Sequence, residues 1–483
     1  MEEKNLKFMI LVVAYNAITT LVKVLDRIPK DVWDEVGEVV VFDDCSSDET
    51  TLLAKGYKES RKLEKLSIYR NERNLGYGGN QKKGYEYAIS KGYDYVILLH
   101  GDGQYAPESL GDFIKVAKER EPAMVSGSRM LNRKRALKGG MPLYKFLGNI
   151  ILTTYQNFML HSKLSEFHSG YRMYKTEVLK NLHLDKYSDD FHFDTQIMVE
   201  ILHRHGEIVE IPIPTFYGKE ICYVNGMKYA FNVFKSVFQY KLFTLGLTNC
   251  DWVEPLSKTK YSPKKSPLSS HKRVAFFVPR NSTVLDIGAE GNYIEELKEK
   301  GCNVIGITLS SLPSEVKSKY DEVIIDDLEK EGWKEFLSGK RFDAIILADV
   351  IEHLRDSKKL ISFLKDFLKK DGIVIASTPN IAHLYIRFCL LFGKFPYSKR
   401  GILDETHLHF YTKKSFRKLF ENEGYHLLNK RFTPIPFELF SGKSRFTKIV
   451  AQILEYSYYI FVKISPSLFA YQMVYVFRKN YKI

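Results

Sequence analysis

The hydrophobic positions of this chain follow two alternating patterns. Short runs of β-branched and other apolar residues are separated by longer segments in which apolar residues recur every three or four positions. Such runs are typical of buried strands, and the longer segments are typical of helices that cover a sheet. In the first half of the chain the runs predict strands at residues 8–13, 38–42, 66–69, 95–99 and 124–127.

The same alternation restarts after an interruption at residues 248–270. Apolar periodicity is lost there, and Pro, Ser and Lys accumulate, which is typical of a linker or an extended arm. Strands that alternate with helices favour parallel sheets that bind ligands at the carboxyl ends of their strands. We therefore predict an α/β protein of two domains, at residues 1–247 and 271–483, joined by the linker. The strands of the second domain are predicted at residues 283–287, 303–307, 322–325, 344–348, 373–377 and 471–477.

Composition narrows the class of protein. A chain of 483 residues is too long for one ordinary core, and an apolar content of 45% excludes wholesale disorder. The net charge of +14 suits anionic ligands such as nucleotide sugars or phospholipids, although a solvated basic surface would explain it equally well. No nucleic-acid partner is expected, because no module of interleaved basic and aromatic residues is recognisable.

Location is also constrained by the sequence. The five cysteines show no paired spacing, which favours neither a disulfide framework nor a zinc site and points to a reducing cytoplasm. The first residues are acidic and lead into a strand, unlike a secretory signal, and no run of about 18 uncharged apolar residues predicts a spanning helix. We expect a cytoplasmic protein, with peripheral contact at the inner membrane face as an open alternative.

Three polar motifs follow strands of the first half. Asp43 and Asp44 end the second strand, where carboxylates can accept hydrogen bonds from a nucleotide base or ribose, although a capped turn would explain them too. Residues 74–88 place several glycines before an amphipathic run, which suits a backbone that approaches a phosphate-bearing ligand. After the fourth strand, Asp102 and Gln104 can offer hard oxygen ligands to Mg²⁺ or Mn²⁺.

This order of motifs resembles the family-two glycosyltransferases of GT-A fold, and within them the dolichyl-phosphate mannose synthase branch. The likeness spans residues 5–245 and includes the tracts GSRM at 127–130, EFHSGYRMY at 166–174 and FHFDTQIMVE at 191–200. It implies that Asp43 and Asp44 read the base and ribose of a nucleotide-sugar donor. It also implies a metal held by Asp102, Gln104 and His100; the histidine replaces the usual first aspartate and leaves the choice of metal open.

The same resemblance implies further catalytic residues. Arg129 and Arg172 correspond to basic residues near the phosphates of donor or acceptor, although either could form a structural ion pair instead. Asp194 is the candidate base for a sugar hydroxyl, with a helix-capping role as the alternative. A polyprenyl-phosphate acceptor would need no strong base.

The second half opens with a different nucleotide cradle, VLDIGAEGNY at residues 284–293. The dehydrogenase fingerprint G-x-G-x-x-G is absent, so a nicotinamide cofactor is disfavoured. Together with IIDDLE at 324–329, FDAIILADVIEHL at 342–354 and DGIVIASTPN at 371–380, the segment resembles class I S-adenosylmethionine-dependent methyltransferases. The resemblance implies that the cofactor is bound by a set of six residues, with His353 at the transfer site. These six are Asp286 and Gly288 at the methionine end, Gly291 in the same turn, Thr308 beside the ribose, Asp327 near the adenine and Asp349 beside His353.

Two departures from that pattern leave two functions open. Glu290 stands where the motif usually has glycine, and Thr308 stands where an acid usually holds the ribose hydroxyls. Threonine lacks the charge-assisted grip of a carboxylate. We predict a bifunctional enzyme that transfers a sugar to a glycan or polyprenyl-phosphate acceptor and methylates a related acceptor. The alternative is a glycosyltransferase with a non-catalytic scaffold domain.

The apolar, Tyr-rich stretch at residues 449–464 has two interpretations. It predicts either a helix packed on the second sheet or an interfacial helix at a membrane surface.

Overall fold

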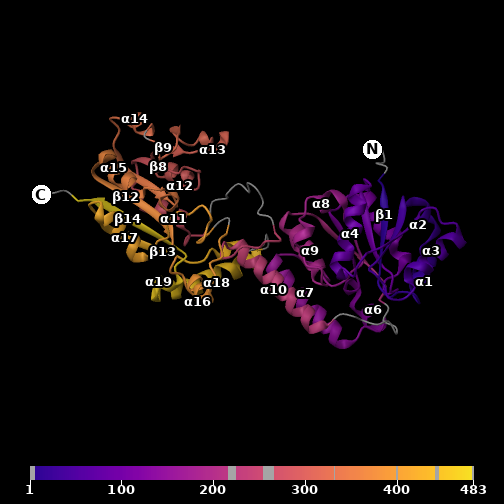
Figure 1. Cartoon of the computed structure of the whole chain (residues 1–483). Coiled ribbons are helices and arrows are strands. Elements are labelled where there is room, and N and C mark those ends of the chain that lie inside the picture. The colour runs from indigo at the N-terminus through magenta and orange to yellow at the C-terminus, as the bar shows by residue number, and fades with distance from the viewer. Residues whose placement is uncertain are drawn as a thin grey trace. The chain divides into compact units, whose positions relative to one another are not determined.

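The computed structural model describes residues 6–215, 225–253, 266–330, 332–398, 401–440 and 445–480. The chain divides into two compact units, each with its own seven-stranded sheet (Figure 1). The first unit comprises Met1–Lys241 and Cys250–Glu254, and the second comprises Leu242–Asn249 and Pro255–Ile483.

The sheet of the first unit has the strand order β3-β2-β1-β4-β6-β5-β7. All neighbouring strands are parallel except β6, which runs antiparallel to β4 and β5. The central strands β1 and β4 are buried along almost their whole length, as expected for a sheet covered on both faces. The strands are β1 (Phe8–Ala14), β2 (Glu38–Asp43), β3 (Leu66–Arg70), β4 (Tyr95–His100), β5 (Met124–Ser128), β6 (Arg172–Lys175) and β7 (Ile208–Pro212).

The helices of the first unit follow the strands and cover the sheet. They are α1 (Leu21–Asp26), α2 (Lys30–Glu35), α3 (Thr50–Arg61), α4 (Gly76–Ser90), α5 (Leu110–Arg120), α6 (Arg133–Lys138), α7 (Leu143–Leu160), α8 (Thr176–Lys180), α9 (Phe193–His203) and α10 (Gly226–Thr244). The long helices α7 and α10 lie side by side (Figure 1), where the rings of Tyr155 and Phe234 stack with centroids 4.9 Å apart.

The sheet of the second unit has the order β10-β9-β8-β11-β12-β14-β13, and β14 is antiparallel to both of its neighbours. Its strands are β8 (Thr283–Ile287), β9 (Asn303–Thr308), β10 (Glu322–Ile325), β11 (Phe342–Ala348), β12 (Leu368–Pro379), β13 (Tyr425–Thr433) and β14 (Gln472–Lys479). Its helices are α11 (Ser270–Phe277), α12 (Ile294–Glu299), α13 (Ser314–Lys317), α14 (Trp333–Phe336), α15 (Ser357–Phe367), α16 (Leu384–Leu391), α17 (Lys413–Asn422), α18 (Arg445–Ile464) and α19 (Pro466–Phe469).

The prediction of an α/β protein with two sheets is confirmed, and each predicted strand is present. The expectation of purely parallel sheets is wrong, because β6 and β14 are antiparallel. The sequence analysis also missed β6, β7 and β13. Strand β6 is only four residues long, and β13 is an edge strand with mostly exposed side chains, so neither carries the apolar run on which the prediction relied.

The predicted linker at residues 248–270 begins as packed chain. The side chains of Cys250, Trp252 and Val253 are buried, and the Trp252 ring meets Tyr187 edge-on at 6.2 Å. Residues 254–265 lie outside the described part of the chain. The second unit resumes before α11, where the Ser269 hydroxyl accepts a hydrogen bond from the Lys272 amide and caps the helix.

The stretch at residues 449–464 lies in helix α18. Ala451, Glu455 and Val462 are buried, so one face packs on the unit. The opposite face exposes large apolar side chains, namely Ile449, Ile453, Tyr456, Ile460, Phe461 and Ile464. Within the described ranges, no helix combines the length and the hydropathy needed to cross a bilayer.

Candidate active sites

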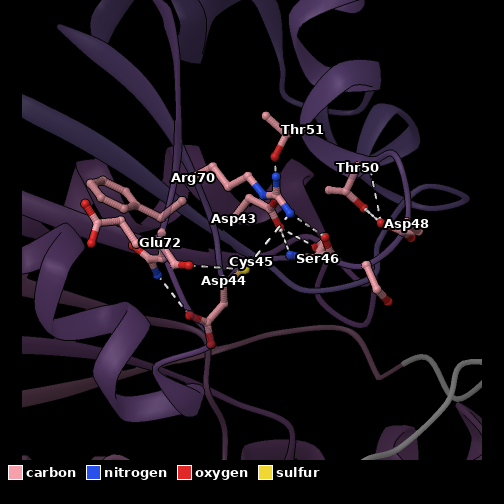
Figure 2. Close-up of polar contacts among 12 residues, drawn as sticks. Asp43, Asp44, Cys45, Ser46, Asp48, Thr50, Thr51, Arg70 and Glu72 are labelled. Atoms are coloured by element: carbon pink, nitrogen blue, oxygen red, sulfur yellow. Dashed lines mark hydrogen bonds and ion pairs between the residues drawn. The ribbon is translucent and has the colours of Figure 1, made fainter.

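The turn after β2 contains two buried carboxylates (Figure 2). Asp43 accepts hydrogen bonds from the hydroxyl groups of Ser46 and Thr51, and the Arg70 Nε lies 3.8 Å from its Oδ2. Arg70 also donates to the carbonyl oxygen of Ser46 at 3.0 Å. The Asp43 carboxylate therefore organises the turn from β2 to α3.

Asp44 organises a second segment, the entry to α4. Its carboxylate accepts hydrogen bonds from Asn71 Nδ2 at 2.9 Å, the Leu75 amide at 2.8 Å and the Gly76 amide at 2.9 Å. Both aspartates thus have partners within the protein, as in the capped-turn alternative. Their predicted contacts with base and ribose stay a prediction.

The predicted metal turn begins at His100, the last residue of β4. The imidazole ring packs edge-on against Tyr105 and Tyr77, with centroids 4.9 and 5.6 Å away, and its Nε2 lies 3.4 Å from the Tyr77 hydroxyl. Gly170 completes this enclosure, because a Cβ there would lie 2.8 Å from the ring. Burial lowers the pKa of His100, so the imidazole is neutral at pH 7.

Asp102 and Gln104 are half-buried and lie on the same turn. Asp102 Oδ1 accepts a hydrogen bond from the Gln104 amide at 3.0 Å. Across the described ranges, no three His, Cys, Asp or Glu side chains form a group suited to a metal ion. The predicted set has only two residues of these four types, since Gln104 is its third member, and it stays a prediction.

Asp194 lies in the first turn of α9 and faces the same interior as His100. The Tyr77 hydroxyl donates to its Oδ2 at 2.9 Å, and Arg172 Nη1 lies 3.8 Å from its Oδ1. Within the described structure Oδ1 has no hydrogen-bond partner although it is buried. The site thus brings a predicted base and a predicted metal-turn residue together around Tyr77.

Arg172 is fully buried, and its donors are used within the fold. It donates to the carbonyl oxygens of Ser169 at 2.6 Å, Phe167 at 2.7 Å and Asp194 at 2.9 Å. The guanidinium has no solvent exposure in this structure. Its contacts are those of the ion-pair alternative and fix the start of α9 and the loop at residues 167–169. A contact between Arg172 and a ligand phosphate stays a prediction.

Arg129 is also engaged with a carboxylate. Its guanidinium pairs with buried Glu166, and Asn149 from α7 donates to the same carboxylate at 2.8 Å. Burial alone would raise the pKa of Glu166, but Arg129 holds it below its usual value. The Arg129 side chain keeps 13% of its surface exposed, whereas the Glu166 side chain is fully buried.

The residues that hold this site together are not among those predicted from the sequence. Tyr77 and Tyr105 enclose His100, Glu166 orients Arg129, and the Tyr229 hydroxyl from α10 lies 2.9 Å from His168 Nδ1. Tyr77, Glu166 and His168 fall within tracts that carried the resemblance, so their position in those tracts was the available signal.

The second unit contains a cavity of about 940 Å³ at the carboxyl ends of β8, β9 and β11. This volume lies within the usual range of ligand pockets. Five of the predicted site residues line it, namely Gly288, Thr308, Asp327, Asp349 and His353. The segment Leu242–Asn249 adds Thr244, Leu245 and Gly246 to its wall.

Two predicted cofactor residues do not line the cavity. Asp286 lies beneath it and accepts hydrogen bonds from the hydroxyls of Tyr293 and Tyr320; burial raises its pKa to about 6. Asp286 thus holds Tyr293, which forms part of the wall, and its predicted direct contact with a cofactor is not seen in the lining of this cavity. The Gly291 amide donates to the Tyr320 hydroxyl at 3.1 Å, in the same supporting layer.

Gly288 is the residue at which the cradle turns. Its φ is +80°, and a Cβ there would lie 2.5 Å from Val350 Cγ2, so both the backbone and the space require glycine. The Thr308 hydroxyl, at the end of β9, donates to the Ser310 carbonyl oxygen at 3.1 Å. The Thr308 oxygen can still accept a hydrogen bond, and its predicted place beside the ribose stays a prediction.

Asp349 and His353, the residues predicted at the transfer site, are each held by neighbouring side chains. Asp349 accepts from Ser377 Oγ at 2.8 Å and Gln472 Nε2 at 2.7 Å, which fixes its carboxylate at the end of β11. His353 Nδ1 lies 3.0 Å from the Thr406 hydroxyl, and its ring meets His407 with centroids 4.7 Å apart.

Comparison with known proteins now bears on both sites. Residues 9–182 match the family model for glycosyl transferase family 2, and residues 250–430 match a methyltransferase domain model. The chain joins a family 2 glycosyltransferase domain to a methyltransferase domain. The predicted resemblance to both families is confirmed.

Several relatives align with the glycosyltransferase domain. An uncharacterised protein of Methanocaldococcus jannaschii is 28% identical over 209 residues, covering 43% of this chain and 81% of the relative. An undecaprenyl-phosphate mannosyltransferase of Micrococcus luteus is 26% identical over 223 residues, covering 45% and 86%. A polyprenol monophosphomannose synthase of Mycolicibacterium smegmatis is 23% identical, covering 38% and 68%.

Solved structures are similar to each domain. Glucosyl-3-phosphoglycerate synthase from Mycobacterium tuberculosis is 14% identical, with a TM-score of 0.38 over 49% of this chain and 78% of that chain. A SAM dependent methyltransferase from Archaeoglobus fulgidus is 19% identical, with a TM-score of 0.29 over 44% of this chain and 95% of that one.

The cavity of the methyltransferase domain is acidic although the whole chain is basic. Among its lining residues are one arginine and seven carboxylates, namely Glu290, Asp326, Asp327, Glu329, Asp349, Glu352 and Asp404. The arginine, Arg355, is 85% exposed and lies 3.7 Å from Glu329. Such a wall favours cationic ligands over anionic ones.

Proposed function

We propose that the glycosyltransferase domain transfers a sugar from a nucleotide-diphosphate donor to a polyprenyl-phosphate acceptor at a membrane surface. The observation that carries this proposal is an exposed apolar face on α7 and α10. Its members are Leu143, Tyr144, Leu147, Ile151, Phe158, Met227, Phe231, Phe234 and Phe238. The relatives named as mannosyltransferases of polyprenyl phosphates support the same class of acceptor.

The helices of this face also reach the site. Asn149 of α7 donates to Glu166, the partner of Arg129, and Tyr229 of α10 contacts His168. One side of each helix therefore meets the polar site while another side is apolar and exposed. A lipid phosphate that approaches along this face would enter the site with its head group first.

Basic residues next to the apolar face favour binding of this face to an anionic bilayer. Helix α6, which packs on α7, exposes four basic residues, Arg133, Lys134, Arg135 and Lys138. Apolar side chains that enter the interface and basic residues that meet anionic head groups are the combination that holds a peripheral protein at a membrane.

In the proposed reaction the phosphate oxygen of the acceptor attacks the anomeric carbon, and the nucleoside diphosphate leaves with the electrons of the broken bond. Arg129, partly exposed and held by Glu166, would stabilise the negative charge that develops on the phosphates. A glycan acceptor is the second candidate, because the buried Asp194 Oδ1 lacks a hydrogen-bond partner within the described residues. That oxygen would receive the proton of a sugar hydroxyl.

For the second domain we propose methyl transfer from S-adenosylmethionine. The cofactor supplies a methyl group on a sulfonium, and the acidic cavity suits this cation together with the ammonium of its amino-acid end. Gly288, Thr308, Asp327 and Asp349 would hold it at the strand ends. Tyr293, fixed by Asp286, would shape the wall beside it.

Two measurements on the full chain test these functions. Radiolabelled nucleotide sugars are incubated with short-chain polyprenyl phosphate in vesicles, and label in the lipid fraction is the expected product. Label in a water-soluble glycan instead would favour the second acceptor class, and release of free sugar alone would count against both. Calorimetry with S-adenosylmethionine should give saturable heat; no heat would leave the scaffold alternative.

A further inference from the structure

Glu352 is a buried carboxylate that the predicted sites did not include. It lies in the 3-10 turn η4 (Ile351–His353) after β11 and lines the cavity of the methyltransferase domain. The residue is 1% exposed, and neither carboxylate oxygen has a partner with hydrogen-bond geometry in the described part of the chain, although the Thr378 hydroxyl lies near enough to affect its pKa. Asp349, three positions earlier, has a partner for each oxygen.

The backbone fixes Glu352 in this position. Its carbonyl oxygen accepts hydrogen bonds from the amides of Leu408 at 2.8 Å and His409 at 3.0 Å, so η4 is tied to the segment at residues 408–409. Burial raises the pKa of Glu352 well above its usual value, and Asp349 raises it further, whereas the Thr378 hydroxyl opposes the shift. A buried carboxyl group without hydrogen bonds destabilises a fold. Its presence in a ligand cavity indicates a functional role.

Glu352 lies at one border of the proposed cofactor residues. Gly288, Thr308 and Asp327 come from the ends of β8, β9 and β10, whereas Asp349, at the end of β11, is a charged neighbour of Glu352. Other titratable residues of the same cavity are His353, Asp404 and His407. Burial lowers the pKa of His407, and the neighbouring His353 lowers it further, so His407 adds no positive charge at pH 7. A phosphorylated or otherwise anionic acceptor would meet carboxylates without a buried cation to offset them.

We propose that Glu352 is the catalytic base of the methyltransferase domain and that its acceptor is the hydroxyl group of a neutral sugar. This inference rests on the proposed methyl transfer. Glu352 accepts the hydroxyl proton while the acceptor oxygen forms its bond to the methyl carbon. The carbon–sulfur bond breaks, its electron pair stays on sulfur, and S-adenosylhomocysteine remains as a neutral thioether.

The test separates the acceptor from the cofactor. Calorimetry on the full chain first measures S-adenosylmethionine binding by wild type, Glu352→Gln and the control Glu455→Gln. Glu455 is a buried glutamate outside this cavity whose carboxylate accepts from the Ser266 hydroxyl at 2.7 Å. All three proteins should bind the cofactor within about threefold of one another. Loss of binding only in Glu352→Gln would place Glu352 in the cofactor site and overturn the inference, and no binding by wild type would remove the proposed function as well.

The second stage uses protein saturated with S-adenosylhomocysteine. Methyl glycosides of mannose, glucose and galactose are titrated in parallel with the corresponding sugar 1-phosphates. At least one neutral glycoside should bind wild type, and the sugar phosphates should bind at least about tenfold more weakly. The inference is overturned if no neutral glycoside binds or if the phosphates bind more tightly.

The final stage measures transfer of a labelled methyl group to the glycoside that binds. Glu352→Gln should lower kcat by about 10² or more, as for loss of a general base, with KM changed less than about threefold. Glu352→Asp should retain an intermediate rate, and Glu455→Gln should match wild type. An unchanged kcat in Glu352→Gln would overturn the catalytic role.

Discussion

Tyr77 and Asp194 are separated by 117 positions in the sequence and joined by a hydrogen bond of 2.9 Å. Tyr77 lies in the glycine-rich entry to α4 and Asp194 in the first turn of α9. The bond leaves Asp194 Oδ2 with a donor, whereas the buried Oδ1 has none within the described residues. Tyr77 also lies against His100, so one phenol connects the candidate base to the candidate metal turn.

This relationship predicts how acceptor chemistry depends on Asp194. Asp194→Asn should lower transfer to a sugar hydroxyl by about 10² or more but transfer to a polyprenyl phosphate by less than about tenfold, because only the hydroxyl needs a base. Tyr77→Phe should lower either rate more modestly, through the orientation of the carboxylate. Initial rates with the two acceptor classes measure both effects.

A matched control is Tyr57→Phe. This change also removes a tyrosine–aspartate hydrogen bond, that of Tyr57 with Asp26 at 2.8 Å, but outside the site. It should leave both rates unchanged. Equal losses with both acceptors in Asp194→Asn would contradict the base role.

The metal turn yields a second prediction, about ion dependence. If Asp102 and Gln104 hold Mg²⁺ or Mn²⁺ together with the donor diphosphate, Asp102→Asn should lower sugar transfer by at least about 10². Excess chelator should have the same effect on wild type, and full activity in chelator would contradict a metal here. Glu108→Gln is a control. This nearby carboxylate lies outside the turn and pairs with Arg27 Nε at a distance of 2.8 Å.

His100 can be tested in the same assay. His100→Asp would restore an oxygen donor and should shift the preference toward Mg²⁺. Tyr77, Tyr105 and Gly170 enclose the His100 ring, so a packing role is the alternative to metal binding. An unchanged preference between Mg²⁺ and Mn²⁺ would mean that His100 serves packing.

The sequence predicts the fold of this protein better than it predicts the geometry of its sites. Apolar runs located the buried strands well, because burial on both faces leaves a continuous apolar signature. Short β6 and exposed β13 carry no such signature. Motif positions identified residues that lie near each other, but they did not specify orientation. Arg172 and Asp286 lie in the predicted regions, yet their charged groups are used inside the protein because of partners far along the chain, such as Asp194 and Tyr320.

The apolar face on α7 and α10 predicts binding to anionic vesicles. Ile151→Glu combined with Phe231→Glu should lower the bound fraction in vesicle sedimentation by at least about tenfold, because it places charge at the interface. Removal of basic charge from α6, for example by Arg133→Gln and Lys134→Gln, should weaken binding more at low than at high salt.

The control for the vesicle assay is Leu52→Glu on α3. Leu52 is 65% exposed and apolar but lies on a different helix. This variant should bind vesicles as wild type does. Equal binding to neutral and anionic vesicles would argue against the role assigned to α6.

Thr308, which stands where an acid usually holds the ribose, predicts that an acidic substitution raises the affinity for S-adenosylmethionine. Thr308→Asp should bind S-adenosylmethionine about 10-fold or more tightly than wild type, because a charge-assisted hydrogen bond is added. Asp286→Ala should lose binding, since Tyr293 and Tyr320 would lose their common acceptor and the cavity wall its shape. Calorimetry measures both, and a weaker Thr308→Asp would indicate that the ribose lies elsewhere.

The last prediction concerns stability and needs no ligand. Because the pKa of Glu352 is raised in the folded protein, the folded state holds a proton that the unfolded chain releases near its ordinary pKa of about 4.5. The stability linked to this proton is present below that value and is lost as the pH rises through the folded pKa.

Glu352→Gln keeps the shape without the charge, so it should match wild type near pH 4.5 and exceed it in melting temperature near pH 8. Thermal denaturation across this range measures the difference. Glu335→Gln, at an exposed position on α14 of the same domain, should show no such trend. If Glu352→Gln melts below wild type at pH 8, the carboxylate stabilises the fold, and its buried position would need no functional explanation.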